Sequence, residues 1–574
     1  MRILFLTHSF NSLTQRLYVE LVRRGHEVSV EFDIHDAVTR EATELFQPRL
    51  IVAPYLRRRI PEEIWKNFVC IVLHPGIPGD RGPSALDWAI MNEETEWGVT
   101  ALQANAEMDA GDIWATASFP MRTARKSSIY RHETTEAAVA VLLQTVERFE
   151  KGGFKPEPLD YRKPEARGRF RPFMGQDLRS IRWTEDSTSF IVKKIHAADG
   201  FPGVLDTLFG EEYFLFGAHA EDALKGRAGE VIVQRHGAIC RATVDGAIWI
   251  SHLKKNTPGE DAFKLPAAMV LGDHLRNVPE SPLPIHIHPE GKTFREIYYE
   301  EKSGVGYLHF DFYNGAMSTE QCHRLLDAYR YALERDTRII VLMGGPDFWS
   351  NGIHLNVIET AESPAEESLR NITAMNDLAR AIICANTHLT MAALRGNAGG
   401  GGVFLALTAD RVYARKGIIL NPHYKSMGNL YGSEYWTYLL PKRVGKERAK
   451  ALTENRLPVG APEARDMGLI DDCFGEDAVD FQKRVESIAQ DFAVHPDFEK
   501  WMLEKNENRK KDERTKSLAT YRAEEMEHMK LNFFGFDPSY HVARRHFVHK
   551  TPHSRTPPHL ARHRRLKSTL NPAE

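Results

Sequence analysis

The chain has 574 residues, and at roughly 100–200 residues per domain this length predicts three or four domains. Its 42% hydrophobic and 27% charged residues are close to the averages of soluble globular proteins, and its formal net charge of -3 gives no reason to expect a nucleic acid as partner. No apolar run approaches a membrane span, and the first residues lack the apolar region of a signal peptide. We therefore expect a cytoplasmic protein that binds neither membranes nor nucleic acids.

The first part of the chain alternates between strand and helix patterns. The expected elements are strand 1–7, helix 12–25, strands 28–34, 49–53 and 69–73, a strand pair 98–104 and 112–118, and a helix 133–150. Strands that alternate with helices are typical of a parallel, doubly wound sheet. We therefore expect residues 1–155 to form one α/β domain of this kind.

Two connectors enclose a small β-rich region. Residues 156–175 are rich in Pro, Arg and Lys, which predicts a linker, and the proline-rich residues 256–300 predict a second connector. Between them, a helix at 186–199 and short strands separated by glycine turns predict a small β-barrel-like domain over 176–255. The strands are expected at 213–217, 229–234, 238–244 and 247–251.

A second α/β unit is predicted over 301–490, followed by charged helical and basic segments. Its strands are expected at 305–310, 337–343, 389–395 and 410–413, and its helices near 318–335, 364–385 and 399–407. Residues 491–537 predict a helical extension. Residues 538–574 are basic and rich in His and Pro, and we expect a mobile, solvated tail there rather than a metal or nucleic-acid site.

The cysteines argue against a metal centre and for a reducing compartment. They are scattered and form no C-x-x-C pair, which speaks against a disulfide framework or a zinc ribbon. Their positions are 70, 240, 322, 384 and 473. No metal site is predicted.

A histidine at the end of a buried strand is the first candidate for chemistry. Residues 73–85 read LHPGIPGDRGPSA, so His74 lies at the carboxyl end of a strand, where open α/β sheets bind ligands. Residues 98–114 read GVTALQANAEMDAGDIW and place Asp109 in a turn between strands. These blocks resemble the formyltransferases that use 10-formyltetrahydrofolate, including methionyl-tRNA formyltransferase. The resemblance implies that His74 and Asp109 are catalytic and covers about residues 1–255.

The first block departs from that family at one position. The family's asparagine, two residues before the histidine, falls on Val72, which cannot hydrogen-bond a formyl oxygen through its side chain. This suggests a changed acceptor or different support of the oxyanion. Gln103 is an alternative polar group for a cofactor, or a surface strand residue. Arg131 either binds phosphates of a cofactor or pairs with Glu133.

Two glycine-containing turns form the second candidate site. Residues 337–355 read TRIIVLMGGPDFWSNGIHL, and residues 396–411 read GNAGGGGVFLALTADR, with Gly400, Gly401 and Gly402 in a run that allows close approach of backbone to a ligand. Together they resemble the crotonase (enoyl-CoA hydratase/isomerase) superfamily, with its ββα spiral fold. The resemblance implies that coenzyme A binds here and that the amides of Ile353 and Gly401 hold a thioester oxygen.

Both carboxylates of the hydratases are missing from the second site. One falls on Phe404 and the other near Tyr424, so addition of water to an enoyl-CoA is not expected. The segment 421–436, NPHYKSMGNLYGSEYW, instead offers Tyr424, Tyr431 and Glu434 for chemistry. The alternative for its aromatic residues is a packing surface.

A formyl donor module and a thioester module on one chain suggest formyl-CoA as a shared intermediate. The double fusion resembles a family of hydrogenase-maturation factors. That likeness implies transfer of a formyl group from 10-formyltetrahydrofolate to coenzyme A, decarbonylation to carbon monoxide, and hydrogenase-maturation proteins as partners. Three alternatives remain open: a formyltransferase with another acceptor, a formyl-CoA hydrolase, and a non-enzymatic carrier of folate or coenzyme A.

Overall fold

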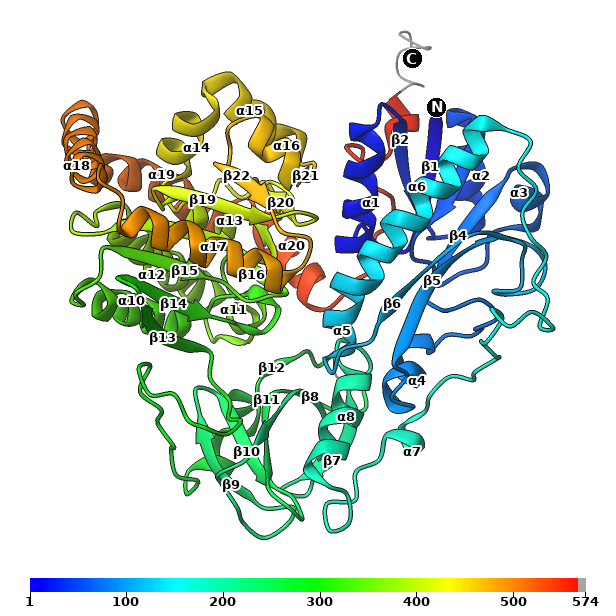
Figure 1. The fold of residues 1–574 in the computed structure, drawn as a ribbon, viewed down its shortest axis with the longest axis horizontal. Coiled ribbons are helices and arrows are strands. Elements are labelled where there is room, and N and C mark those ends of the chain that lie inside the picture. The colour runs from blue at the N-terminus through cyan, green and yellow to red at the C-terminus, as the bar shows by residue number, and fades with distance from the viewer. Residues whose placement is uncertain (260, 566–574) are drawn as a thin grey trace.

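The computed structural model describes residues 1–259 and 261–565, which form three bodies around a common junction (Figure 1). An N-terminal module and a C-terminal module lie on opposite sides of the view, and a small β module lies below and between them. Asp199 of the small module joins all three, because its carboxylate accepts hydrogen bonds from Ser127 of the N-terminal module (2.6 Å) and from Tyr313 of the C-terminal module (3.0 Å). In the part of the chain described here, no helix is both long and apolar enough to cross a membrane.

The N-terminal module is the expected doubly wound sheet. Its strands have the order β2-β1-β3-β4-β5-β6. Strands β1 to β4 are parallel, and β5 is antiparallel to both of its neighbours, β4 and β6. Their bounds are β1 Arg2–Thr7, β2 Glu27–Phe32, β3 Leu50–Ala53, β4 Cys70–His74, β5 Glu96–Gln103 and β6 Ile113–Pro120. Helices pack on both faces of this sheet, so its central strands are apolar throughout. These helices are α1 Ser12–Arg23 and α6 Thr135–Lys151 on one face, and α2 Asp36–Phe46 and α3 Glu62–Asn67 on the other.

The segment predicted as a linker is instead part of the N-terminal module. Residues 168–171 run along the loop that follows β4: Gly168 donates its N–H to Pro78 (2.9 Å), and Arg171 donates its N–H to Arg81 (2.9 Å). The Pro- and Arg-rich composition misled the prediction, since an extended segment can satisfy its backbone groups against a neighbouring loop without any periodicity.

The small β module contains an antiparallel sheet against helix α8 (Thr188–Ala198). Its strand path is β7-β8-β11-β10-β9, with β12 paired to β11, so the barrel-like sheet is open in the described chain. The bounds are β7 Val204–Leu208, β8 Glu211–Glu221, β9 Val231–Arg235, β10 Ala238–Ala242, β11 Ala247–Lys255 and β12 Leu265–Pro266. Helix α9 (Ala267–Leu271) continues the core of this module into the predicted connector.

The C-terminal module has two sheets, as expected for the crotonase-like fold. The larger sheet has the order β13-β14-β15-β17-β19-β22, and the smaller has the order β16-β18-β20-β21. The bounds are β13 Ile297–Lys302, β14 Val305–Phe310, β15 Ile339–Met343, β16 Phe348–Ser350, β17 Leu389–Leu394, β18 Asn397–Gly399, β19 Arg411–Arg415, β20 Ile419–Asn421, β21 Val459–Gly460 and β22 Asp472–Phe474. The helices are α10 Thr319–Leu333, α11 Leu355–Thr360, α12 Pro364–Ile383, α13 Gly401–Leu407, α14 Trp436–Val444, α15 Lys446–Asn455 and α16 Ala461–Asp466.

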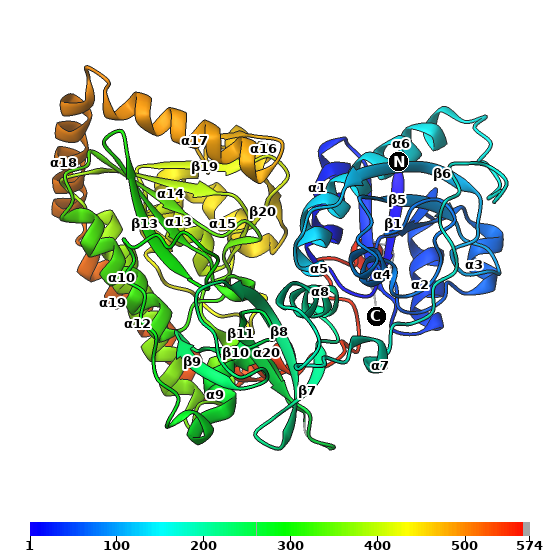
Figure 2. The same ribbon diagram turned by 60° about the horizontal axis from the view of Figure 1, so that its bottom comes forward.

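The chain then forms the expected helical extension and returns to the first module. Helices α17 (Ala478–Ala493), α18 (Phe498–Thr515) and α19 (Leu518–Phe534) cover the C-terminal module, and α20 (Ser539–Val548) follows. Beyond α20 the chain reaches strand β2 of the N-terminal module (Figure 2).

The prediction of a mobile, solvated tail is wrong for residues 538–565. Leu560 accepts the N–H of Val30 on edge strand β2 (3.0 Å), and the fully buried His563 lies 3.0 Å from the buried carboxylate of Glu31. Arg564 pairs with the same carboxylate at 2.6 Å. The tail therefore covers a sheet edge that would otherwise be exposed, and it connects the C-terminal part of the chain to the N-terminal module. Residues 566–574 lie outside the described residues.

Candidate functional sites

His74 is held between two carboxylates at the end of β4. Its side chain is 5% exposed, its Nε2 lies 3.0 Å from Asp80 Oδ2, and its Nδ1 lies 3.7 Å from Asp109 Oδ1. The imidazole lies directly over Gly76, where a β-carbon would overlap the ring. The structure thus brings the predicted pair His74 and Asp109 together and adds Asp80.

The carboxylates decide the charge of His74. Burial by itself lowers the pKa of His74, but the hydrogen bond to Asp80 and the charges of Asp109 and Asp80 outweigh it, so the pKa lies above its ordinary value. Arg171 Nε lies 3.5 Å from the other oxygen of Asp80, which places a cation from the misassigned linker behind this carboxylate. The two carboxylates therefore favour the imidazolium form of His74, which can donate to a developing oxyanion.

Val72 and Gln103 do not supply the missing amide next to His74. Val72 pairs with Leu102 in the sheet, and its side chain packs against the apolar cluster on the helix α2 face. Gln103 Oε1 accepts a hydrogen bond from Trp114 Nε1 (3.0 Å). Gln103 is therefore placed as a strand residue that orients a tryptophan.

The second site is built from two glycine turns in contact. Gly352 (φ +77°) follows β16 and Gly400 (φ +52°) precedes α13, both in backbone conformations that favour glycine. A β-carbon on Gly352 would lie 3.3 Å from the amide nitrogen of Gly401. Gly401 is the first residue of α13, whose initial N–H groups have no acceptor within the helix. The amide of Gly401 thus lies close to the turn that precedes Ile353.

The neighbouring glycines fix the backbone of that turn. Gly400 donates its N–H to Asn421 (3.0 Å), and the carbonyl of Gly402 accepts a hydrogen bond from Trp349 Nε1 (2.8 Å). A β-carbon on Gly402 would overlap the Ser350 carbonyl. Gly400 and Gly402 therefore shape the turn through their backbone.

Glu434 lies directly against the oxyanion turn. Its side chain is 1% exposed, and a β-carbon on Gly401 would overlap its Oε1. The Tyr424 hydroxyl donates to Glu434 Oε2, and the Tyr424 ring stacks on Phe404 with 5.2 Å between centroids. Burial raises the pKa of Glu434 to about 8, although the hydrogen bond from Tyr424 opposes the shift. The pair therefore offers a carboxyl group that can donate or accept a proton near neutral pH.

Tyr431 is not part of this pair. Its ring stacks on His528 of α19 with 4.1 Å between centroids, and its N–H donates to Asn532 Oδ1 (3.0 Å). Tyr431 thus belongs to a packing surface, the alternative given for the aromatic residues of this segment, while two other candidates, Tyr424 and Glu434, are in contact with each other.

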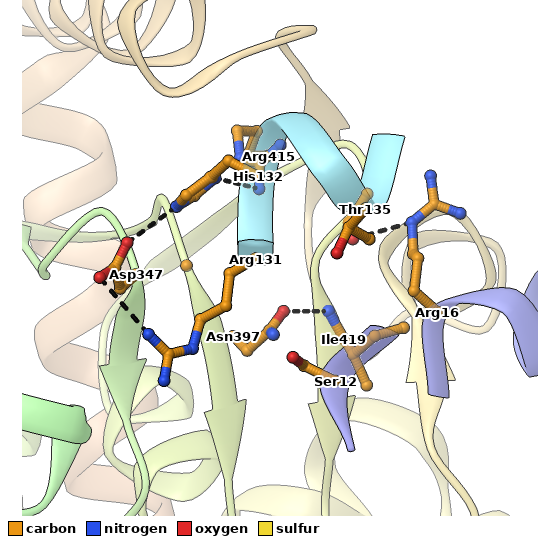
Figure 3. A pocket seen from close by; sticks show the side chains of 11 residues that line it. Ser12, Arg16, Arg131, His132, Thr135, Asp347, Asn397, Arg415 and Ile419 are labelled. Carbon is orange, nitrogen blue, oxygen red and sulfur yellow. Dashed lines mark hydrogen bonds and ion pairs between the residues drawn. The ribbon is translucent and has the colours of Figure 1, made fainter. Parts of the chain in front are cut away.

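A small cavity of about 10 Å³, lined in part by cationic side chains, lies where the N-terminal and C-terminal modules meet (Figure 3). Arg131 and Arg16 reach it from the first module, and Arg415 from the second. Arg131 Nη1 lies 3.6 Å from Asp347 Oδ2, while Glu133 pairs with Arg122. Arg131 therefore does not form the predicted alternative ion pair with Glu133, and its carboxylate partner is Asp347 of the other module.

Asp347 is the main polar contact across this junction. It is 4% exposed and accepts hydrogen bonds from Ser128 (2.6 Å), His132 (3.1 Å) and Arg125 (3.1 Å) of the first module. Burial alone raises the pKa of Asp347, but the hydrogen bond from His132 and the charges of Arg125 and Arg131 lower it below its ordinary value.

Two residues of these sites were missed in the sequence. Asp80 lies in the same sequence block as His74, and a carboxylate in this glycine-rich loop could have been recognised as a candidate. Glu525 on α19 bonds the segment that carries Glu434, and no local pattern connects residues this far apart. Within residues 1–259 and 261–565, no group of three or more His, Cys, Asp or Glu side chains is placed to hold a metal ion.

Comparison with known proteins matches each module to a family. Residues 12–146 match the formyl transferase family, residues 174–264 match the formyl transferase C-terminal domain, and residues 300–532 match the enoyl-CoA hydratase/isomerase family. Methionyl-tRNA formyltransferase of Moorella thermoacetica is 29% identical over 38% of this chain and 70% of its own. Fold and sites thus define a formyltransferase-type module fused to a crotonase-type module.

Two relatives share the whole arrangement. The hydrogenase maturation factor HoxX of Bradyrhizobium diazoefficiens is 53% identical, with 98% of this chain and 97% of that protein aligned. The crystal structure of HypX from Aquifex aeolicus in complex with tetrahydrofolic acid superposes with a TM-score of 0.96 at 51% identity, covering 99% of both chains. The chain belongs to the HoxX/HypX family of hydrogenase maturation factors.

Proposed function

We propose that this protein transfers the formyl group of 10-formyltetrahydrofolate to coenzyme A at the His74 site and decarbonylates the resulting formyl-CoA at the Glu434 site. The carbon monoxide would serve as an iron ligand of a [NiFe]-hydrogenase, handed on through other maturation proteins. The observation that carries the proposal is the carboxyl group of Glu434, which lies against the Gly401 turn and accepts a hydrogen bond from Tyr424.

In the first reaction, the thiol of coenzyme A attacks the formyl carbon and the bond to folate N10 breaks. The thiol proton ends on N10, so no further reactant is needed. The imidazolium of His74 donates to the oxyanion, which compensates for Val72 at the position of the family's asparagine. Asp80 and Asp109 keep the proton on His74. Tetrahydrofolate in the Aquifex aeolicus relative supports folate as the donor.

In the second reaction, the formyl C–H and C–S bonds break and give carbon monoxide and the thiol of coenzyme A. The electron pair of the C–S bond stays on sulfur, and the formyl hydrogen leaves as a proton. Glu434, protonated near neutral pH, gives its proton to the sulfur, and the carboxylate then takes the formyl proton. Tyr424 holds the carboxyl group by its hydrogen bond, and the amides of Ile353 and Gly401 hold the formyl oxygen.

Arg131, at the junction of the two modules, is proposed to contact a phosphate of coenzyme A from outside the junction cavity, because that cavity, of about 10 Å³, has room for no more than a water molecule. Arg16 and Arg415 line the same cavity and pair with Glu136. The guanidinium of Arg131 has several N–H donors, which suit phosphate groups. An anchor between the sites lets one pantetheine arm serve both of them, which raises the local concentration of the formyl thioester.

The test is turnover of the purified protein with 10-formyltetrahydrofolate and coenzyme A, with haemoglobin trapping any carbon monoxide. We expect His74→Ala to abolish formyl-CoA formation, and Glu434→Ala to let formyl-CoA accumulate. Free formate instead of carbon monoxide would support the hydrolase, a formylated amine would support another acceptor, and tight binding without turnover would support a carrier. Carbon monoxide at the normal rate from Glu434→Ala would refute the assignment of the second site.

A further inference from the structure

The turn that carries Glu434 has a backbone that needs outside support. Glu434 (φ 59°) and Tyr435 (φ 60°) are both left-handed, a conformation that costs free energy for residues other than glycine. Two such residues in succession persist only where neighbouring groups hold them. Residues 433–437, here called the Glu434 turn, therefore depend on their hydrogen-bond partners.

One buried carboxylate of the helical extension supplies most of these partners. Glu525 on α19 is 1% exposed, and its Oε2 accepts the N–H of Tyr435 (3.0 Å) and the Ser433 hydroxyl (3.2 Å). Its Oε1 accepts both the N–H (2.9 Å) and the hydroxyl (2.6 Å) of Thr437. The carboxylate thus binds both sides of the left-handed pair and caps the start of α14.

Helix α12 holds the same turn from a second direction. Asn376 Oδ1 accepts the N–H of Glu434 (2.8 Å) and the Ser433 hydroxyl (2.9 Å). Ser433 also donates its N–H to Glu434 Oε2 (3.2 Å), so this one residue links the carboxyl groups of Glu434 and Glu525.

We propose that Glu525 is a positioning residue of the second site, which holds the Glu434 turn so that the Glu434 carboxyl group faces the oxyanion amides. The crotonase-type module would then be incomplete without α19, and the extension would belong to the catalytic unit rather than cover it. The kinetic part of this inference rests on the proposed decarbonylation; the geometric part does not.

The electrostatics agree with this geometry. Burial is the main reason that the pKa of Glu525 rises to about 7, and the charge of Glu525 in turn raises the pKa of Glu434. Two buried carboxyl groups linked by one serine titrate as a pair. A charge on Glu525 therefore favours the protonated, proton-donating form of Glu434.

Other titratable groups face this pair and must be counted in a pH profile. They are Tyr424, Tyr431 and Tyr435 from the segment around the turn, and Cys322 from α10. Burial raises the pKa of each of them, so none of these groups should lose its proton in the range in which the two glutamates titrate.

The test is Glu525→Gln in the full-length protein, read out in two ways. Carbon monoxide release from supplied formyl-CoA should fall about tenfold, because the turn loses a charged acceptor. Infrared titration of the carboxylic C=O band, assigned to Glu434 by its loss in Glu434→Gln, should show a midpoint lowered by about one pH unit, because a neighbouring negative charge is gone.

Two further variants separate positioning from simple stability. Glu525→Asp keeps the charge but shortens the side chain, so it should slow carbon monoxide release while the Glu434 midpoint stays within about half a pH unit of that of the unaltered protein. Glu527→Gln removes an exposed carboxylate from the same helix and should change neither readout.

The inference is overturned if Glu525→Gln folds and matches Glu527→Gln in both rate and midpoint. If Glu525→Gln does not fold, an unchanged rate in Glu525→Asp overturns it. The infrared midpoint needs no turnover. A shifted midpoint in a protein that releases no carbon monoxide would therefore support the close contact of Glu525 with the Glu434 turn while refuting the proposed decarbonylation.

Discussion

The two sites favour the protonated form of a buried side chain by opposite physical means. At His74 burial lowers the pKa, and two carboxylates reverse the effect by favouring the cation. At Glu434 burial itself raises the pKa to about 8, and the neighbouring charge of Glu525 adds to it. The first site is therefore governed by paired charges and the second by the exclusion of water.

The largest effect is expected from Glu434→Gln. This variant keeps the shape of the side chain but cannot exchange a proton, and general acid–base catalysis contributes about 10²–10⁴-fold. Carbon monoxide release should fall about 10³-fold while formyl-CoA accumulates, measured by haemoglobin trapping and chromatography. A fall of the same size in formyl transfer would contradict the separation of the two sites.

The next largest effect is expected when Asp347, which joins the N-terminal and C-terminal modules, loses its charge. Asp347→Asn leaves Arg125 and Arg131 without their buried anionic partner, which should cost about 3 kcal/mol in the free energy of unfolding at neutral pH. We expect formyl-CoA to escape into solution as well. Asp336→Asn, an exposed substitution in the same module, is the control, and denaturant unfolding with fluorescence is the measurement.

The pH dependence of this effect has a definite sign. The pKa of Asp347 is lowered in the folded protein, so its contribution to stability is present above the pKa of the unfolded chain, about 3.9, and is lost as the pH falls. The difference between the unaltered protein and Asp347→Asn should therefore shrink below about pH 4. A difference that is constant with pH would show that Asp347 acts without its charge.

A smaller effect on formyl transfer is expected when the charge beside His74 is removed. Asp80→Asn removes a charge that raises the pKa of His74, so that pKa should fall. Formyl transfer should slow about tenfold at pH 7.5 and recover toward lower pH, where the imidazolium returns. Asp112→Asn, in the nearby turn, is the matched control. An unchanged pH profile would show that the charge of His74 is not set by Asp80.

The smallest effect is expected at the tyrosine that the structure separates from Glu434. Tyr431→Phe keeps the stack on His528, so carbon monoxide release should stay within about twofold. Tyr424→Phe removes the hydroxyl bonded to Glu434 and should slow release far more. If both variants slowed carbon monoxide release equally, Tyr431 would have to be counted as part of the second site.

The candidate sites could be predicted wherever the signal is contiguous in the sequence. His74 at a strand end, the turn of Asp109, and the glycine run at 400–402 are local patterns, and each lies where it was expected. Gln103 was less predictable, because the direction of a polar strand residue depends on what packs beside it, here Trp114.

The sequence by itself determined the two modules and most of their chemical groups, because strand ends and glycine turns are fixed by nearest neighbours along the chain. Only the tertiary structure decided what surrounds these groups. Arg171 behind Asp80, Glu525 beneath the Glu434 turn, and the tail on strand β2 all join segments distant in sequence. Charge and proton affinity at a buried site depend on such neighbours, and packing alone brings them there.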